Sequence, residues 1–343
     1  MMRKLLNTLY ITDELCYLSK DGENIVIKKD DKEIKRLPIH ILEGIICFNY
    51  NGVSPGTMRL CNENNITITF LTPTGRLCGR FTGKTNGNVY LRRTQYRYAD
   101  NEEISLELAK QFITGKMINS RKVLKRLIRD HGEKVDVHKI NSVSEDLLSK
   151  IKNIETIQNK DSLRGIEGEG ARKYFNCFDE MILQQKEDFY FNGRNKRPPM
   201  DNVNALLSYL YSILTYEIQS ALESVGLDSY VGFFHTDRPG RASLALDMIE
   251  ELRSYMVDRF VITMINKKQI TKGNFIKKEN RSVIMDDDGR KIILTAWQDR
   301  KREEIIHPFL KEKIMIGLIP YVQAQLLARY IRGDLDEYPP FLI

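Results

Sequence analysis

The segment GFFHTDRPGRASLALDMIEELR, residues 232–253, combines an imidazole with two acids one helical turn apart. A helix beginning near Ala242 places Asp247 and Glu250 on a narrow polar stripe, within about 60° of each other. Two such acids repel each other in a partly buried setting unless one is protonated or a cation lies between them. His235, on the preceding loop, could give that cation a nitrogen ligand, and this ligand set suits Mg²⁺ or Mn²⁺ better than structural zinc. A solvated acidic face beside an ordinary histidine is the alternative.

A second candidate is the stretch LRGIEGEGARKYF, which places Glu167 among glycines at what the sequence suggests is the start of a helix. Gly165, Gly168 and Gly170 each weaken a helix by about 1 kcal/mol relative to alanine. We interpret them as a cleared surface that lets a nucleic-acid strand or another backbone approach Glu167. Tight helix–helix packing is the alternative, and a phosphate-cradling loop is disfavoured because Glu167 and Glu169 would repel the phosphate.

Two basic segments could contact a phosphate backbone. The helical segment SRKVLKRLIRDH places five cations on an arc of about 140°, opposite its apolar residues. The loop GRNKRPP supplies further cations just before an apolar helix. The alternative for both segments is a solvated charged face. The DNA-binding candidates in these two segments are Arg121, Lys122, Lys125, Arg126, Arg129, Arg194 and Arg197.

The elements that must position these residues follow an α+β order. Residues 1–85 contain short β-branched or aromatic runs separated by turn compositions, which predicts a small antiparallel sandwich or curled sheet with one helix near 55–62. A linker at 86–99 and a mainly α-helical domain at 100–343 follow. Within that domain, SVIMDDDGRKIIL predicts a β-hairpin with an Asp/Gly turn. The tail RGDLDEYPPFLI is expected to extend over a surface or a partner.

Composition sets broad limits on the class of protein. The chain has 343 residues, of which 42% are hydrophobic, and a net charge of +7, which favours a polyanionic partner without proving one. The sequence contains no run of eighteen apolar residues, so it predicts no membrane-spanning helix. Five cysteines without a CxxC pair argue against a zinc site or a disulfide framework. We therefore expect a cytoplasmic protein.

Taken together, the motifs resemble those of the CRISPR-associated integrase family, Cas1. RGIEGEGARKYF is similar to the family's helix bearing its first metal-binding glutamate, and RPPMDNVNALLSYLYSIL to its helix after a basic loop. GFFHTDRPGRASLALDMIEELR resembles its histidine and acidic-helix motif, and the LDEYPPFL tail resembles the type I-C branch. The resemblance implies a β-sandwich joined to an α-helical catalytic domain, a homodimer, double-stranded DNA as substrate, and assembly with the companion protein Cas2.

By that resemblance the metal ligands are Glu167, His235 and Glu250, and Asp247 is an auxiliary catalytic acid. Arg238 and Arg241, beside the histidine, are candidate phosphate clamps. Glu169 stands where relatives often have a small residue.

The implied reaction is metal-dependent phosphoryl transfer. A 3′-hydroxyl of a short DNA fragment attacks a phosphodiester at the edge of a repeat array, so that the fragment is inserted as a spacer. Without a proper acceptor the same site would act as an endonuclease. Two other functions stay open at this point: a non-catalytic nucleic-acid-binding scaffold, and a metal-dependent hydrolase of a small phosphate ester.

Overall fold

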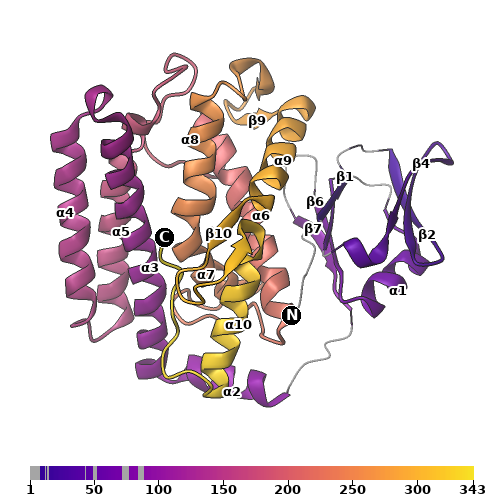
Figure 1. The fold of residues 1–343 in the computed structure, drawn as a ribbon, viewed down its shortest axis with the longest axis horizontal. Helices are drawn as coiled ribbons and strands as arrows, with labels where there is room; N and C mark the ends of the chain where they lie inside the picture. Colours follow the sequence, from indigo (N-terminus) through magenta and orange to yellow (C-terminus); the bar gives the residue numbers. More distant parts are fainter. Residues whose placement is uncertain are drawn as a thin grey trace. The chain divides into compact units, whose positions relative to one another are not determined.

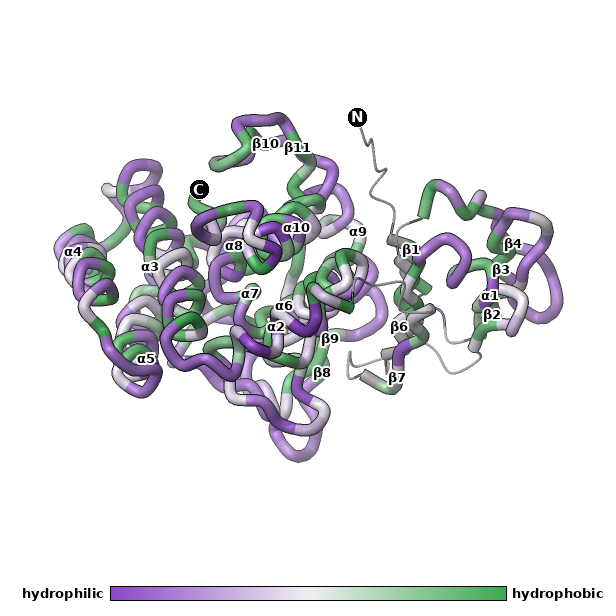
Figure 2. The backbone as a smooth tube through the Cα atoms, turned by 90° about the horizontal axis from the view of Figure 1, so that it is seen from below, coloured by the Kyte–Doolittle hydropathy of each residue, from purple (hydrophilic) through white to green (hydrophobic). Residues whose placement is uncertain are grey.

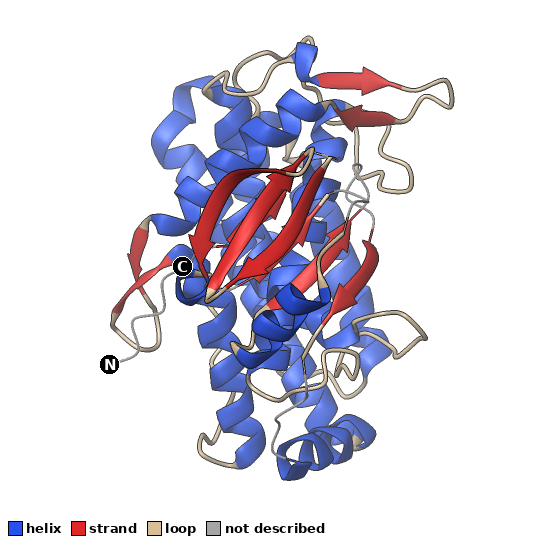
Figure 3. Cartoon of the chain, turned by 90° about the vertical axis from the view of Figure 1, so that its right-hand side faces the viewer, coloured by secondary structure: helices blue, strands red, loops and turns tan. Residues whose placement is uncertain are grey.

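The computed structural model describes residues 8–11, 13, 15–42, 44–48, 52–71, 77–83 and 89–343, which form two compact units. The first unit combines the N-terminal residues up to 87 with Arg290–Ile305 and Lys313–Ile319. The second comprises Asn88–Gly289, Ile306–Glu312 and Pro320–Ile343. The longer strands all belong to the N-terminal region, and the other described strands are three residues long (Figure 3). The predicted α+β class is confirmed.

The N-terminal region contains two sheets. One is antiparallel and has the order β2-β3-β4. The other has the order β1-β5-β6-β7, with β1, β5 and β6 parallel and β7 antiparallel to β6. The strands span Cys16–Asp21 (β2), Asn24–Lys29 (β3), Lys32–Pro38 (β4), Thr8–Ile11 (β1), Gly44–Cys47 (β5), Thr67–Leu71 (β6) and Leu77–Phe81 (β7).

The expectation of a purely antiparallel arrangement is therefore wrong for the second sheet. Parallel neighbours need a crossover connection, and helix α1 (Pro55–Glu63) supplies one between β5 and β6. Ser54 caps this helix by accepting a hydrogen bond from the backbone N–H of Thr57 at 3.1 Å. Both sheets and α1 contribute to one core, to which Leu18, Ile45 and Leu60 belong.

The second unit is built mainly from helices (Figure 1). Its helices are α2 (Val89–Asp100), α3 (Glu102–His131), α4 (Val137–Ile154), α5 (Lys160–Asn176), α6 (Asn202–Ser224), α7 (Ser243–Arg253) and α8 (Arg259–Asn266), with a π-helical turn, Ser254–Asp258, between the last two. Helix α10 (Ile319–Arg332) comes near the end of the chain. Within this unit, the short strand β8 (Phe275–Lys277) pairs with β9 (Val283–Met285). Strands β10 (Glu304–Ile306) and β11 (Lys313–Met315), which also pair, lie mostly in segments of the first unit.

Asn and Asp side chains fix where the long helices begin. Asn101, Asp136, Asn159 and Asp201 each accept a backbone N–H three residues on, which starts α3, α4, α5 and α6. Hydrophobic and hydrophilic residues alternate along α4 at the outside of the bundle (Figure 2). Its buried residues face inward, as expected for an amphipathic surface helix. Among the residues described, no helix is long and apolar enough to cross a membrane.

The structure differs from two local expectations. The segment after β9 is not the second strand of a hairpin but helix α9 (Asp287–Arg302). Asp286 starts it by accepting the N–H of Gly289 at 2.7 Å, and Ile293, Leu294 and Trp297 are buried at helical spacing rather than in alternation. Of the predicted linker, 86–99, residues 89–99 belong to helix α2, and residues 86–88 lie outside the described residues.

Candidate metal and DNA-processing site

Glu167 lies in the middle of α5, not at its start, because Asn159 caps the helix two turns earlier. An ideal Cβ at Gly165 or Gly168 would meet no other atom within 4 Å. At Gly170 it would lie 3.0 Å from the Cε of Met117. Each interpretation of the glycines therefore holds for part of them. Gly165 and Gly168 leave an open surface, whereas Gly170 permits close helix packing.

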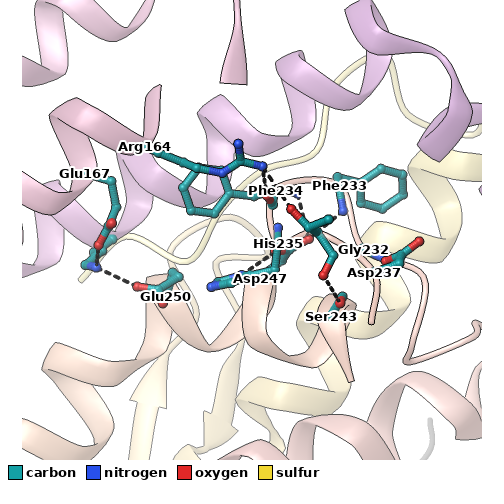
Figure 4. Close-up of polar contacts among 12 residues, drawn as sticks. Arg164, Glu167, Gly232, Phe233, Phe234, His235, Asp237, Ser243, Asp247 and Glu250 are labelled. Carbon is teal, nitrogen blue, oxygen red and sulfur yellow. Dashed lines mark hydrogen bonds and ion pairs between the residues drawn. The ribbon is translucent and has the colours of Figure 1, made fainter. Parts of the chain in front are cut away.

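The loop that carries His235 is held by Asp247. This fully buried carboxylate accepts hydrogen bonds from the backbone N–H groups of Phe233 at 2.6 Å, Phe234 at 3.0 Å and His235 at 2.9 Å. It also contacts Nδ1 of His235 at 2.7 Å (Figure 4). A solvated acidic face is therefore excluded for Asp247. Because Nδ1 faces this carboxylate, Nε2 is the ring nitrogen left for a ligand, and Asp247 acts as an orienting group.

Gly232 is a further part of this loop that the sequence motifs did not single out. A Cβ at this position would lie 2.8 Å from Cβ of Ser243 and 2.9 Å from Oδ2 of Asp247. Only glycine lets the loop approach the start of α7 this closely. The hydroxyl of Ser105 on α3 also donates to the carbonyl of Phe233 at 3.0 Å, so both α3 and α7 anchor the loop.

Glu250 and Glu167 meet at one ammonium group. The Nζ of Lys116, on α3, lies 2.7 Å from Oε2 of Glu250 and forms an ion pair with Oε1 of Glu167. In Figure 4 the carboxylates of Glu167 and Glu250 point toward one another. Arg253, one turn after Glu250, contacts its other oxygen at 3.0 Å.

Cations dominate the electrostatics at Glu250, whose exposed fraction is 5%. Burial raises the pKa of its carboxyl, but Arg253, Lys116 and His235 together lower the pKa to about 2. Glu250 is therefore an anion at neutral pH. The sequence motifs identified the acids but not Lys116 or Arg253. Lys116 could have been found in the sequence, because it lies between the core residues Ile113 and Met117 of α3, where a charged side chain is unusual.

The donor set fits a divalent cation. Within the described part of the chain, no three His, Cys, Asp or Glu side chains lie close enough together to hold a metal ion. Instead, the Lys116 ammonium supplies the positive charge between the two carboxylates, and His235 lies close enough to act electrostatically on Glu250. Two carboxylates and one imidazole nitrogen are ligands that suit Mg²⁺ or Mn²⁺.

Glu169 points away from this group. Its carboxylate contacts the ammonium groups of Lys150 at 2.6 Å and Lys173 at 3.1 Å, which lower its pKa to about 2. It therefore belongs to the packing of α5 against α4, and the structure does not bring it to Glu167.

The basic stripe on α3 is partly engaged within the protein. Arg121 donates to the carbonyl of Ser144 at 3.0 Å, and both Arg121 and Lys125 lie 3.2 Å from Glu145 on α4. Arg126 and Arg129 pair with Asp130 at 3.1 and 2.8 Å, and Lys122 is exposed. DNA contact by these five residues stays a prediction.

The remaining basic candidates differ in exposure. Arg194 is partly buried and donates to Asn204 at 2.6 Å and Ser208 at 3.0 Å, so it has a structural role. Its guanidinium and that of Arg253 both contact the ring of Tyr211, at 5.4 and 5.0 Å from the centroid. Arg197 and Arg238 are exposed and Arg241 is partly exposed.

Comparisons with known proteins agree with this geometry. The family model described as CRISPR associated protein Cas1 matches residues 9–299. Two proteins named CRISPR-associated endonuclease Cas1, from Chlorobaculum tepidum and Rhodospirillum rubrum, are 48% and 46% identical, each over 99% of both chains.

Solved structures agree on the fold. A casposase bound to its integration product superposes with a TM-score of 0.83 at 24% identity, covering 98% of this chain and 94% of that one. A CAS1 protein from Thermotoga maritima has the same TM-score at 21% identity, covering 97% and 99%. From the family model and these full-length relatives, we conclude that the chain belongs to the Cas1 family.

Proposed function

We propose that the protein is a divalent-metal-dependent DNA integrase and endonuclease of CRISPR adaptation. One observation carries the proposal: Glu167 on α5 and Glu250 on α7 share one cationic centre beside His235, although they are far apart in the sequence. Glu167, His235 and Glu250 would hold Mg²⁺ or Mn²⁺ there. When bound, such an ion polarises a phosphodiester and stabilises charge on the attacking or leaving oxygen.

The chain's own residues prepare the site for this chemistry. Asp247 holds the imidazole of His235 in one orientation through Nδ1 and three loop N–H groups, so that Nε2 is presented without a search over rotamers. Arg253 keeps the carboxylate of Glu250 ionised and fixed. Pre-organisation of this kind lowers the barrier for phosphoryl transfer by positioning and electrostatics.

A cluster of cations near Glu250 favours a phosphate-bearing substrate. Arg253 contacts Glu250 at 3.0 Å, and the guanidinium groups of Arg194 and Arg253 both contact the ring of Tyr211. Burial lowers the pKa of Lys196, and repulsion from Arg253, Arg194 and Arg197 lowers it further. Attraction from Glu250 acts on the same lysine. Such a concentration of positive charge beside an acidic group is suited to a DNA backbone, and Arg238 and Arg241 would extend it from the His235 loop.

The wider assembly is proposed on the family likeness. A Cas6-RT-Cas1–Cas2 complex superposes with a TM-score of 0.81 at 22% identity over 100% of this chain and 37% of that one. We propose Cas2 as companion, a homodimer, double-stranded DNA as substrate and a cytoplasmic location. Assignment to the type I-C branch rests on the LDEYPPFL tail.

Integration of a labelled DNA fragment into a supercoiled repeat plasmid tests the function. We expect joined product with Mn²⁺ or Mg²⁺ and none with a chelator. Glu250→Gln should lower the yield by more than about 100-fold, since loss of an outer-shell partner alone costs 10–100-fold. Glu169→Gln is the matched control, because Glu169 lies on the same helix as Glu167 but contacts Lys150 and Lys173.

The competing functions give different results in this assay. A non-catalytic scaffold would bind the plasmid but show equal, metal-independent background for wild type and Glu250→Gln. A hydrolase of small phosphate esters would release phosphate from such esters and leave the labelled fragment unjoined. Either result would overturn the proposal.

A further inference from the structure

The C-terminal residues 338–343 pack into the second unit, where they contact the two helices that carry Lys116 and Glu250 (Figure 1). Tyr338 and Phe341 are buried, with exposed fractions of 2% and 0%. The ring of Tyr338 lies 5.2 Å from that of Phe112 on α3, and the ring of Phe341 lies 5.5 Å from that of Tyr255. The tail is therefore part of the folded core.

Glu251 is the centre of this contact. Its carboxylate is fully buried and accepts hydrogen bonds from the hydroxyl of Tyr338 at 2.6 Å, from Nε2 of Gln323 at 3.0 Å and from the backbone N–H of Phe341 at 2.9 Å. Gln323, on α10, also donates to the hydroxyl of Tyr338 at 2.8 Å. Each carboxylate oxygen thus has a donor from the C-terminal region.

Asn119, on α3, closes the same network from the other side. Its Nδ2 donates to the backbone carbonyls of Glu251 and Phe341, both at 2.7 Å, and its Oδ1 accepts the N–H of Ile343 at 3.0 Å. One fully buried amide therefore joins α3, α7 and the tail. Its hydrogen-bond partners are all backbone groups. Asn119 therefore fixes the distances between the backbones of α3, α7 and the tail.

The network is adjacent to the proposed metal site on both helices. Glu251 follows Glu250, and Gly115 precedes Lys116. Neighbours on a helix point about 100° apart, so one of each pair faces the site and the other faces the tail. At Gly115 a Cβ would lie 2.9 Å from Cβ of Glu251 and 3.1 Å from Cβ of Pro340. Helix α3, helix α7 and the tail thus meet at van der Waals distance.

We propose that Glu251, together with Asn119, is a positioning residue that holds the rotation of α7 and so aims the carboxylate of Glu250 at the site. The C-terminal tail fixes Glu251 through the hydrogen bonds from Tyr338 and Phe341. This inference rests on the proposed function, since it assigns Glu250 a metal to hold.

A purely structural role is a poorer account of the network. Burying a carboxylate costs several kcal/mol before its hydrogen bonds are counted, and an apolar side chain would fill the same space without that cost. Hydrogen bonds depend on direction, so those from a tyrosine, an amide and a backbone N–H define one orientation of helix α7. Apolar packing is less directional and would restrict the orientation less.

Titration of Mn²⁺ into the purified full-length protein tests the inference, with the midpoint of thermal unfolding in chelator as a measure of folding. Glu251→Gln and Tyr338→Phe each remove part of the network while preserving shape. We expect Glu251→Gln to weaken Mn²⁺ binding about 10-fold or more and Tyr338→Phe to weaken it by several fold, as for losses around other metal ligands. Tyr190→Phe, at an exposed tyrosine, is the control and should bind Mn²⁺ like wild type.

Glu250→Gln separates the two proposals. If Glu250→Gln abolishes Mn²⁺ binding while folded Glu251→Gln and Tyr338→Phe bind within twofold of wild type, the positioning role is wrong and the proposed site stands. If Glu250→Gln leaves Mn²⁺ binding unchanged, the proposed site is wrong and the positioning role falls with it. If Glu251→Gln unfolds, Tyr338→Phe decides the result, because it removes only a hydroxyl group.

Discussion

At the residue scale, Lys116 is the side chain on which the charge balance of the site depends. It brings one positive charge to two carboxylates, and its exposed fraction is 5%. A divalent cation at the same place would make this ammonium unnecessary. On the proposed metal site, the ion and the Lys116 ammonium would compete for Glu167 and Glu250.

Lys116→Met should expose this competition. Without metal, we expect a loss of about 3 kcal/mol in the free energy of unfolding, since removal of one partner leaves buried charge uncompensated. Mn²⁺ should restore most of that stability and raise the unfolding midpoint more than it does for wild type. Denaturant unfolding with chelator and with Mn²⁺ measures both effects.

Lys110→Met is the matched control. Lys110 is also buried on α3, but it pairs with Glu107 at 2.7 Å and lies away from the three proposed ligands. Its loss should not be repaired by Mn²⁺. Equal Mn²⁺ effects in the two variants would show that Lys116 does not occupy the place of a metal.

Asp247→Asn tests the orienting role of Asp247. The variant keeps the size of the side chain but places an amide group among four donors, so His235 Nδ1 and the loop N–H groups lose part of their acceptor. We expect Mn²⁺ affinity to fall about 10- to 100-fold. Calorimetric titration measures it, and an unchanged affinity in a folded variant would contradict the role.

The sequence identified some of these residues and not others for a physical reason. Asp247 and Glu250 stand out because helical periodicity places both on one polar stripe. Arg253 contacts Glu250 only three positions away, a spacing that helical periodicity does allow. Lys116 instead matters through Glu167 and Glu250, which lie 51 and 134 positions away, and Gly232 matters through the close approach of its loop to the start of α7. Local periodicity carries no information about such pairs, so their roles appear only in the folded structure.

At the element scale, the glycines of α5 make a test of the open surface beside Glu167. Gly168→Ala should stabilise the protein by about 0.5–1 kcal/mol, because nothing lies within 4 Å of the added Cβ. Gly168→Leu should instead weaken DNA binding several-fold if DNA passes over this surface. Denaturant unfolding and a fluorescence binding titration measure the two effects.

Gly170→Ala serves as the comparison, since its Cβ would press against Met117 at 3.0 Å and should gain less stability. Wild-type DNA affinity in Gly168→Leu would show that no strand approaches α5 at this point. The cost of two glycines in the helix would then need another explanation.

How well each helix or strand could be predicted depended on how clearly the residues in that segment favour one structure. Strands β1–β7 and helix α1 agree with the runs and turns in the sequence, because β-branched residues and turn residues act locally. The hairpin predicted at Asp286–Gly289 is wrong because Asp and Gly are common both in turns and at the start of helices. Ile293 and Trp297, four positions apart and both buried, have the spacing of a helix.

At the scale of the whole molecule, the net charge of +7 does not show where DNA binds. Several cations of the α3 stripe are neutralised by Glu145 and Asp130. By contrast, Arg238 and Arg241, three and six positions after His235, are exposed and partly exposed. Local pairing therefore decides which part of the positive charge can act on a phosphate backbone.

Replacement of both Arg238 and Arg241 by alanine should weaken DNA binding and reduce the slope of log affinity against log salt by about 1–2. Arg332→Ala is the control, because Arg332 pairs with Asp334 at 2.6 Å, is not among the candidate DNA-binding residues and should leave the slope almost unchanged. A larger effect from Arg126→Ala than from the loop pair would place the DNA on α3 instead.

The central claim is that two acidic helices and one oriented histidine surround a single divalent cation. Anomalous diffraction from crystals grown with Mn²⁺ locates that ion directly. We predict one peak bounded by the carboxylates of Glu167 and Glu250 and by Nε2 of His235, with the Lys116 ammonium moved out of the gap. A saturating Mn²⁺ concentration that leaves no peak there, with Lys116 still joining the two carboxylates, would contradict the account.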